Sequence, residues 1–96
     1  MSMTFEWDEA KAVANDRKHG VSFDEAKTVF QDPFALHELD GPHSWEEDRF
    51  IIIGTSFMER ILTVAYVERT AETMRLISAR RATSRERKTY EEKANR

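Results

Sequence analysis

The 96-residue chain contains no cysteine, which excludes disulfide bonds and thiolate metal sites. It also lacks a long hydrophobic run, since the longest comparable stretch, residues 50–53, is far too short to span a membrane. The first residues carry neither a basic flank nor an apolar signal core. We therefore expect the protein to stay in the cytoplasm, where it is made.

Motifs for several kinds of chemistry are also missing. With only three glycines, the chain has no phosphate-binding glycine loop, Walker motif, nucleophile elbow or zinc-protease motif. No ligand pair stands at tight metal spacing, so we expect neither a metal nor a cofactor. An apolar fraction of 40% and a charged fraction of 34% are ordinary for a soluble protein. The length fits one domain over residues 1–96, with a thin core.

The charge is unevenly distributed along the chain. The total is −3, but residues 1–48 carry −8, residues 49–74 are neutral, and residues 75–96 carry +5. A basic C-terminal part can attract phosphate although the whole molecule is acidic. The alternative is two solvated faces of unequal charge.

The pattern of apolar residues predicts an α+β protein. Asp8 can cap a helix that runs to about His19 and ends at Gly20. Ser22 and Glu25 form a capping box for a second helix, which the Asp32–Pro33 pair ends. Strands are expected at residues 4–7, 34–39, 49–56, 60–69 and 73–81, and a polar C-terminal helix is expected at residues 84–94.

Short connections between the last three strands favour an antiparallel meander. The predicted fold is a two-layer domain: a short N-terminal strand and two helices, then the meander, then the C-terminal helix. The helices cover one face of the sheet, and the other face can stay open to bind a ligand. The C-terminal helix is almost entirely polar, so we expect it to pack weakly through Tyr90 and Ala94.

Two basic motifs could act on a phosphodiester. Lys18 and His19 end the first predicted helix, where the imidazole can move a proton and the ammonium can offset phosphate charge. The alternative is a favourable cationic end to the helix dipole. Arg80 and Arg81 end the last predicted strand, and guanidinium groups suit phosphate oxygens, although they could equally protect a sheet edge. Strand alternation places Arg80 on the face shared by residues 74, 76 and 78.

Further charged residues are weaker candidates. Glu47 could be a general base and Arg49 a phosphate clamp, although an acidic cluster more often marks a solvated loop. Glu68 closes a strand and could orient a site residue. Arg85 belongs to the basic surface of the last helix, which could track an RNA backbone or dock an acidic partner.

The ordered set of motifs resembles the BrnT toxins of bacterial type II toxin–antitoxin systems. The motifs span nearly the whole chain: residues 5–11 with Asn15, 18–23 with Glu25 and Ala26, 29–33, 47–49, Gly54, 68–69, 75–82, and 86–87 with Tyr90. The resemblance implies a RelE-like fold and an endoribonuclease activity that slows translation. It also implies inhibition by a BrnA antitoxin with a ribbon-helix-helix part, the complex repressing its own operon. Family motif positions are occupied by Lys18, His19, Glu47, Arg49, Glu68 and Arg80.

These inferences predict metal-independent RNA cleavage by attack of a 2′-hydroxyl on the adjacent phosphate. His19 or Glu47 would transfer protons, and Arg80, Arg49 and Lys18 would hold the phosphate. Operator DNA would be bound only through the antitoxin complex, and no membrane is involved. Two alternatives remain: a non-enzymatic protein-interaction module, or a small DNA-binding regulator, which the negative net charge disfavours.

Overall fold

The computed structural model describes residues 2–40 and 49–94. Its elements are β1 (Thr4–Glu6), α1 (Glu9–His19), α2 (Phe23–Ala26), the 3₁₀ helix η1 (Lys27–Gln31), β2 (Leu36–Leu39), β3 (Arg49–Thr55), β4 (Ile61–Thr70), β5 (Thr73–Arg81) and α3 (Ser84–Ala94). The mixed α+β class predicted from the sequence is confirmed. No helix of the described residues is long and apolar enough to cross a membrane.

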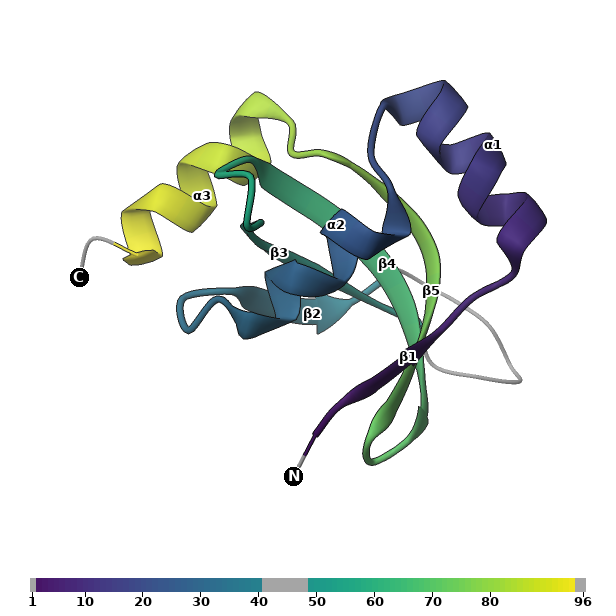
Figure 1. Cartoon of the computed structure of the whole chain (residues 1–96). Coiled ribbons are helices and arrows are strands. Elements are labelled where there is room, and N and C mark those ends of the chain that lie inside the picture. Colours follow the sequence, from purple (N-terminus) through teal and green to yellow (C-terminus); the bar gives the residue numbers. More distant parts are fainter. Residues whose placement is uncertain (1, 41–48, 95–96) are drawn as a thin grey trace.

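The strands form one sheet in the order β1-β5-β4-β3-β2. Neighbouring strands from β2 to β5 pair antiparallel, as short connections require. The edge strand β1 pairs parallel with β5, which the sequence analysis did not anticipate. In Figure 1, α1 and α3 lie on either side of the end of the sheet at which β5 finishes.

Each face of the sheet carries its own core. The larger core packs below α1, α2 and η1, and its buried residues are Val21, Phe23, Ala26, Val29, Ile52, Leu62, Val64, Tyr66, Met74, Leu76 and Ala79. The smaller core contains Ile53, Ala82 and Tyr90 of α3. Because Ile52 and Ile53 are neighbours on β3, they point to opposite faces. The two-layer expectation is therefore incomplete, since α3 covers part of the face expected to stay open.

The second predicted helix is shorter than its apolar pattern suggests. The α-helical part ends at Ala26, and the chain continues as the 3₁₀ helix η1. Val29 is still fully buried, and Phe30 packs against the larger core. The tighter turn keeps the apolar face on the sheet while bringing Asp32 to the backbone N–H of Thr55 at 2.8 Å.

The C-terminal helix α3 is held mainly by polar contacts. The Tyr90 hydroxyl donates to a carboxylate oxygen of Asp32 and lies 2.9 Å from Thr55 Oγ1. Burial and the neighbouring Asp32 carboxylate raise the pKa of Tyr90, so the phenol stays protonated near neutral pH. The expected apolar contacts are present too, since Ala94 packs beside Tyr90.

Candidate functional site

The end of α1 is fixed beside the end of β5. Asn15 is buried, and its side-chain amide donates to the carbonyls of Val21 and Ala79, both at 2.9 Å. Its oxygen accepts from the Ala79 N–H at 3.0 Å. These bonds bring the last turn of α1, with exposed Lys18 and half-buried His19, to the strand end that carries the arginine pair.

Gly20 ends α1 in the left-handed conformation that glycine adopts without strain, with φ 68°. Its N–H donates to the Asp16 carbonyl at 2.7 Å. Its own carbonyl accepts from Arg60 Nη2 at 3.0 Å. Arg60, which directly precedes β4, therefore holds the backbone directly after His19 in place.

Arg60 is in turn fixed by a buried carboxylate. Glu25 is 2% exposed, and it accepts from Arg60 Nε at 2.9 Å, from Arg60 Nη2, and from Ser56 Oγ at 2.7 Å. The guanidinium of Arg60 holds the pKa of Glu25 below its usual value, against the opposing effect of burial. Glu25 thus stays ionised inside the fold. The sequence analysis missed Arg60, which stands in no recognisable motif.

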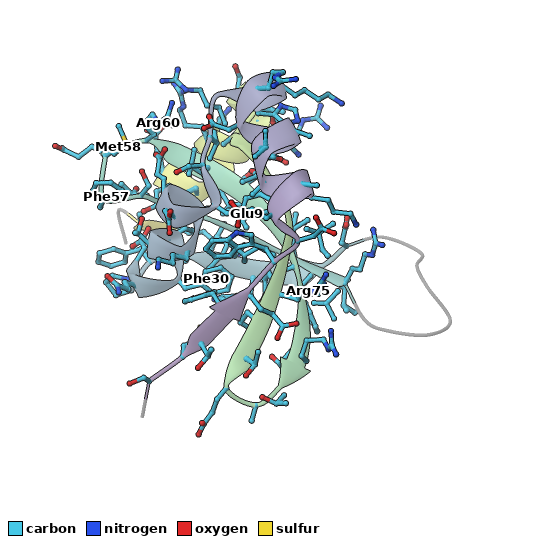
Figure 2. The ribbon with its side chains drawn as sticks, turned by 45° about the vertical axis from the view of Figure 1, so that its right-hand side comes forward. Glu9, Phe30, Phe57, Met58, Arg60 and Arg75 are labelled. Carbon is cyan, nitrogen blue, oxygen red and sulfur yellow. The ribbon has the colours of Figure 1, made fainter. Side chains whose placement is uncertain are left out.

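A hollow of about 310 Å³ opens next to Arg60. It is lined by Glu59, Arg60, Ile61, Arg81, Arg87 and Glu91, and we call it the arginine hollow. Figure 2 places Arg60 at the same end of the molecule as the final turn of α1. Arg81 of β5 and Arg87 of α3 line the hollow together with Arg60, whose guanidinium is held by Glu25, and with the carboxylates of Glu59 and Glu91. The guanidinium groups of Arg81 and Arg87 suit a phosphate group.

Arg80 and Arg81 do not face the way that simple alternation predicts. Ala65 pairs with Ser78 and Tyr66 pairs with Leu76, so Ile77 is left without a partner in a β-bulge. The extra residue shifts the alternation, and Ala79 instead of Ser78 joins Leu76 in the larger core. The predicted grouping of Arg80 with residues 74 and 76 is therefore wrong.

Arg80 points to the α3 side, where it is bound by Glu86. Its guanidinium donates to the two carboxylate oxygens of Glu86 at 2.8 and 3.0 Å. Glu86 also accepts from Thr63 Oγ1 and from the Thr83 N–H, both at 2.9 Å. Arg80 and these donors lower the pKa of Glu86 to about 2, so the pair is ionised at neutral pH. Much of the positive charge of Arg80 is thus balanced within the protein.

The remaining predicted site residues are spread over the molecule. Arg85 is exposed in the first turn of α3 and lines a different hollow, of about 400 Å³, between α3 and β2. Arg49 pairs with Val67, and Glu68 pairs with Met74. Along β4, Val67 and Glu68 lie roughly 13 and 17 Å from Thr63, the partner of Arg80, given a rise of about 3.3 Å per strand residue. Glu47 lies outside the described residues.

The basic end of the molecule therefore combines three kinds of chemical group. Lys18, His19 and Arg81 are brought to one end of the sheet, with Arg80 on the other side of the same strand end. An imidazole can move protons near neutral pH, and ammonium and guanidinium groups stabilise a developing anion. Within residues 2–40 and 49–94, no cluster of three or more His, Cys, Asp or Glu could hold a metal ion.

The chain is similar to known toxins in both sequence and structure. Residues 7–86 match the family model described as the ribonuclease toxin, BrnT, of type II toxin–antitoxin systems. The crystal structure of the Brucella abortus ribonuclease toxin, BrnT, is similar to this chain, with a TM-score of 0.62 and 25% sequence identity. That match covers 86% of this chain and 100% of the Brucella chain. A search of the curated proteins finds no match.

Proposed function

Because this chain belongs to the BrnT family of ribonuclease toxins of type II toxin–antitoxin systems, we propose that it cleaves RNA without a metal ion. A ribose 2′-hydroxyl attacks the adjacent phosphorus, and the bond from phosphorus to the 5′-oxygen breaks. The products are a 2′,3′-cyclic phosphate and a 5′-hydroxyl. Cleavage of cellular RNA by this route slows translation.

The observation that carries the proposal is the anchoring of the α1 end to the end of β5. Asn15 ties the turn that bears His19 to Ala79, two residues before Arg81. The imidazole of His19 takes the proton from the 2′-hydroxyl or returns one to the leaving 5′-oxygen. Lys18 and Arg81 face the charge that develops on the phosphorane.

The other predicted residues take supporting roles in this proposal. Arg80 contributes part of its charge while Glu86 fixes its position. Arg49, Arg85 and Glu68 act on neighbouring parts of the RNA strand, since their positions are too far apart for one phosphate. Glu47 remains an alternative general base.

The test is cleavage of a single-stranded RNA in excess EDTA. We expect cleavage with 2′,3′-cyclic phosphate ends, and a rate loss of about 10²-fold or more for His19→Ala, as for removal of a general acid or base. His37→Ala is the matched control, since His37 lies on β2 and contacts the Tyr66 hydroxyl. Activity that requires Mg²⁺, or a His19→Ala variant as fast as the parent, would contradict the scheme.

A type II toxin implies an antitoxin partner. In our proposal this is a BrnA-type protein with a ribbon-helix-helix part, and only the complex binds operator DNA. Mobility shifts with an operator fragment test this: the complex should bind, and the isolated toxin should not. Tight, salt-sensitive DNA binding by the isolated toxin would instead favour a direct DNA-binding regulator.

A further inference from the structure

The β3–β4 turn exposes two large apolar side chains next to the arginine hollow. Phe57 is 69% exposed and Met58 is 54% exposed, and we call this pair the hairpin tip. Figure 2 shows the hairpin tip beside Arg60 at one corner of the molecule. Glu59 and Arg60, which follow directly in the chain, line the hollow. An apolar surface and a basic surface therefore adjoin.

The backbone of the hairpin tip is held rigidly. The turn is closed by the Ser56 N–H, which donates to the Arg60 carbonyl at 2.8 Å, and by the Glu59 N–H, which donates to the Ser56 carbonyl at 2.8 Å. From the helical layer, Thr28 Oγ1 accepts from the Phe57 N–H at 2.9 Å. An exposed apolar pair on a fixed backbone is suited to docking, because little conformational entropy is lost on binding.

Phe57 also borders a shallow groove. It has a volume of about 240 Å³ and is lined by Thr28, Gln31, Asp32, Thr55, Ser56 and Phe57. An apolar side chain of a partner could enter this groove and contact the Phe57 ring. The surface thus offers the exposed side chains of Phe57 and Met58, a mainly polar groove that Phe57 borders, and the guanidinium groups of the arginine hollow.

We propose that this surface docks an acidic, amphipathic segment of the antitoxin. This inference rests on the proposed ribonuclease function. Apolar residues of the segment pack on Phe57 and Met58, and its carboxylates meet Arg81 and Arg87 in the arginine hollow. Charge complementarity at Arg81 and Arg87 favours carboxylates that approach from the side of these two arginines, away from Glu59 and Glu91 in the same hollow. Such carboxylates compete with RNA phosphates for the same guanidinium groups. Docking at the hairpin tip therefore blocks the phosphate site.

The experiment uses the double variant Phe57→Asp with Met58→Asp and the antitoxin purified from the native operon. We expect RNA cleavage within twofold of the parent, because neither side chain belongs to the proposed chemistry. The antitoxin concentration for half-inhibition should rise at least 100-fold. Val13→Asp is the matched control, since Val13 on α1 is 53% exposed and lines a separate hollow with Trp7 and Phe23. That variant should be inhibited like the parent.

Three outcomes would overturn the inference. One is unchanged inhibition of the double variant, which would place the antitoxin elsewhere. Another is an equal loss of inhibition in Val13→Asp, which would indicate a general charge effect. The third is loss of RNA cleavage with antitoxin binding retained, which would make the hairpin tip an RNA contact. Calorimetric binding of the antitoxin to each variant keeps the docking test valid even if the parent cleaves no RNA.

Discussion

At the residue scale, two glutamates fix the positions of two arginines: Glu25 binds Arg60, and Glu86 binds Arg80. The capping boxes of α2 and α3 each contain a glutamate, but the two glutamates behave differently. Glu86 makes both hydrogen bonds of the capping box: its N–H donates to Thr83 Oγ1 at 3.1 Å, and its side chain accepts from the Thr83 N–H. Glu25 donates its N–H to Ser22 Oγ at 3.0 Å, but its side chain turns inward to Arg60. The same local motif thus supports a surface cap in one place and a buried ion pair in the other.

The Glu86 carboxylate should make stability depend on acid pH. Its pKa in the fold is about 2, against 4.5 for a free side chain. A depressed pKa stabilises the fold above pH 4.5, and the contribution is lost as the pH falls toward 2. Since Arg80 is 41% exposed, solvent screening reduces the effect to about 1–2 kcal/mol.

Glu86→Gln should therefore lower the free energy of unfolding at pH 7 and flatten its decline between pH 4.5 and 2. Urea unfolding at several pH values measures both effects. Glu92→Gln, on the same helix and exposed, is the control and should keep the pH dependence of the parent. Parallel curves for Glu86→Gln and the parent would contradict the assignment.

At the scale of the elements, two irregularities shape the site. The bulge at Ile77 turns Arg80 toward α3 and leaves Ala79 for the anchor from Asn15. The change from α2 to η1 brings Asp32 against β3, where it accepts from the Thr55 N–H and from the Tyr90 hydroxyl. Both features join elements that are distant in the sequence. Each therefore depends on tertiary contacts as well as on local preference.

The close packing of η1 on β3 requires Gly54. A Cβ at this position would lie 2.9 Å from Val29 Cγ1, 3.0 Å from Asp32 Oδ2 and 3.1 Å from Ala35 Cβ. Gly54→Ala should destabilise the fold by about 1–3 kcal/mol through overpacking, measured by urea unfolding. Gly20→Ala is a useful comparison, because nothing lies within 4 Å of that Cβ and only backbone strain at φ 68° opposes it. A Gly54→Ala variant as stable as the parent would show that η1 can move away.

At the scale of the whole molecule, the fold turns a charge gradient along the chain into a spatial one. The basic end of β5 lies beside the basic last turn of α1, and Arg87 of α3 joins Arg81 in the arginine hollow, although the first 48 residues carry −8 overall. Acidic residues elsewhere do not prevent a local positive surface, because exposed charges are screened beyond about 10 Å at 0.1 M salt. A protein with net charge −3 can therefore still attract RNA at one end.

RNA binding at this end should weaken as salt rises. Each phosphate contact to a single strand contributes a slope of about −0.7 to log K against log salt. The double variant Arg81→Ala with Arg87→Ala should make the slope less negative by about one. Arg69→Ala, whose side chain pairs with Glu6 elsewhere on the sheet, should leave the slope unchanged. Fluorescence anisotropy with a labelled RNA measures it, and equal slopes for the two variants would rule out the arginine hollow as a phosphate site.

The sequence by itself determined the family, the α+β class and most element positions. The helix ends at Asp8 and Gly20 follow from local capping and backbone freedom, and the strands follow from short-range alternation. These signals act within a few residues, so they can be interpreted from the chain alone. The ordered motifs also pointed to the BrnT family, which the match over residues 7–86 confirms.

Only the tertiary structure decided which charged residues meet. Arg60, 35 positions after Glu25, became its partner because the β3–β4 turn lies against α2. Arg80 and Arg81 occupy the opposite faces from those that simple alternation predicts, because one unpaired residue in β5 shifted the alternation. Such long-range pairings depend on sheet register and helix packing, which no local pattern encodes.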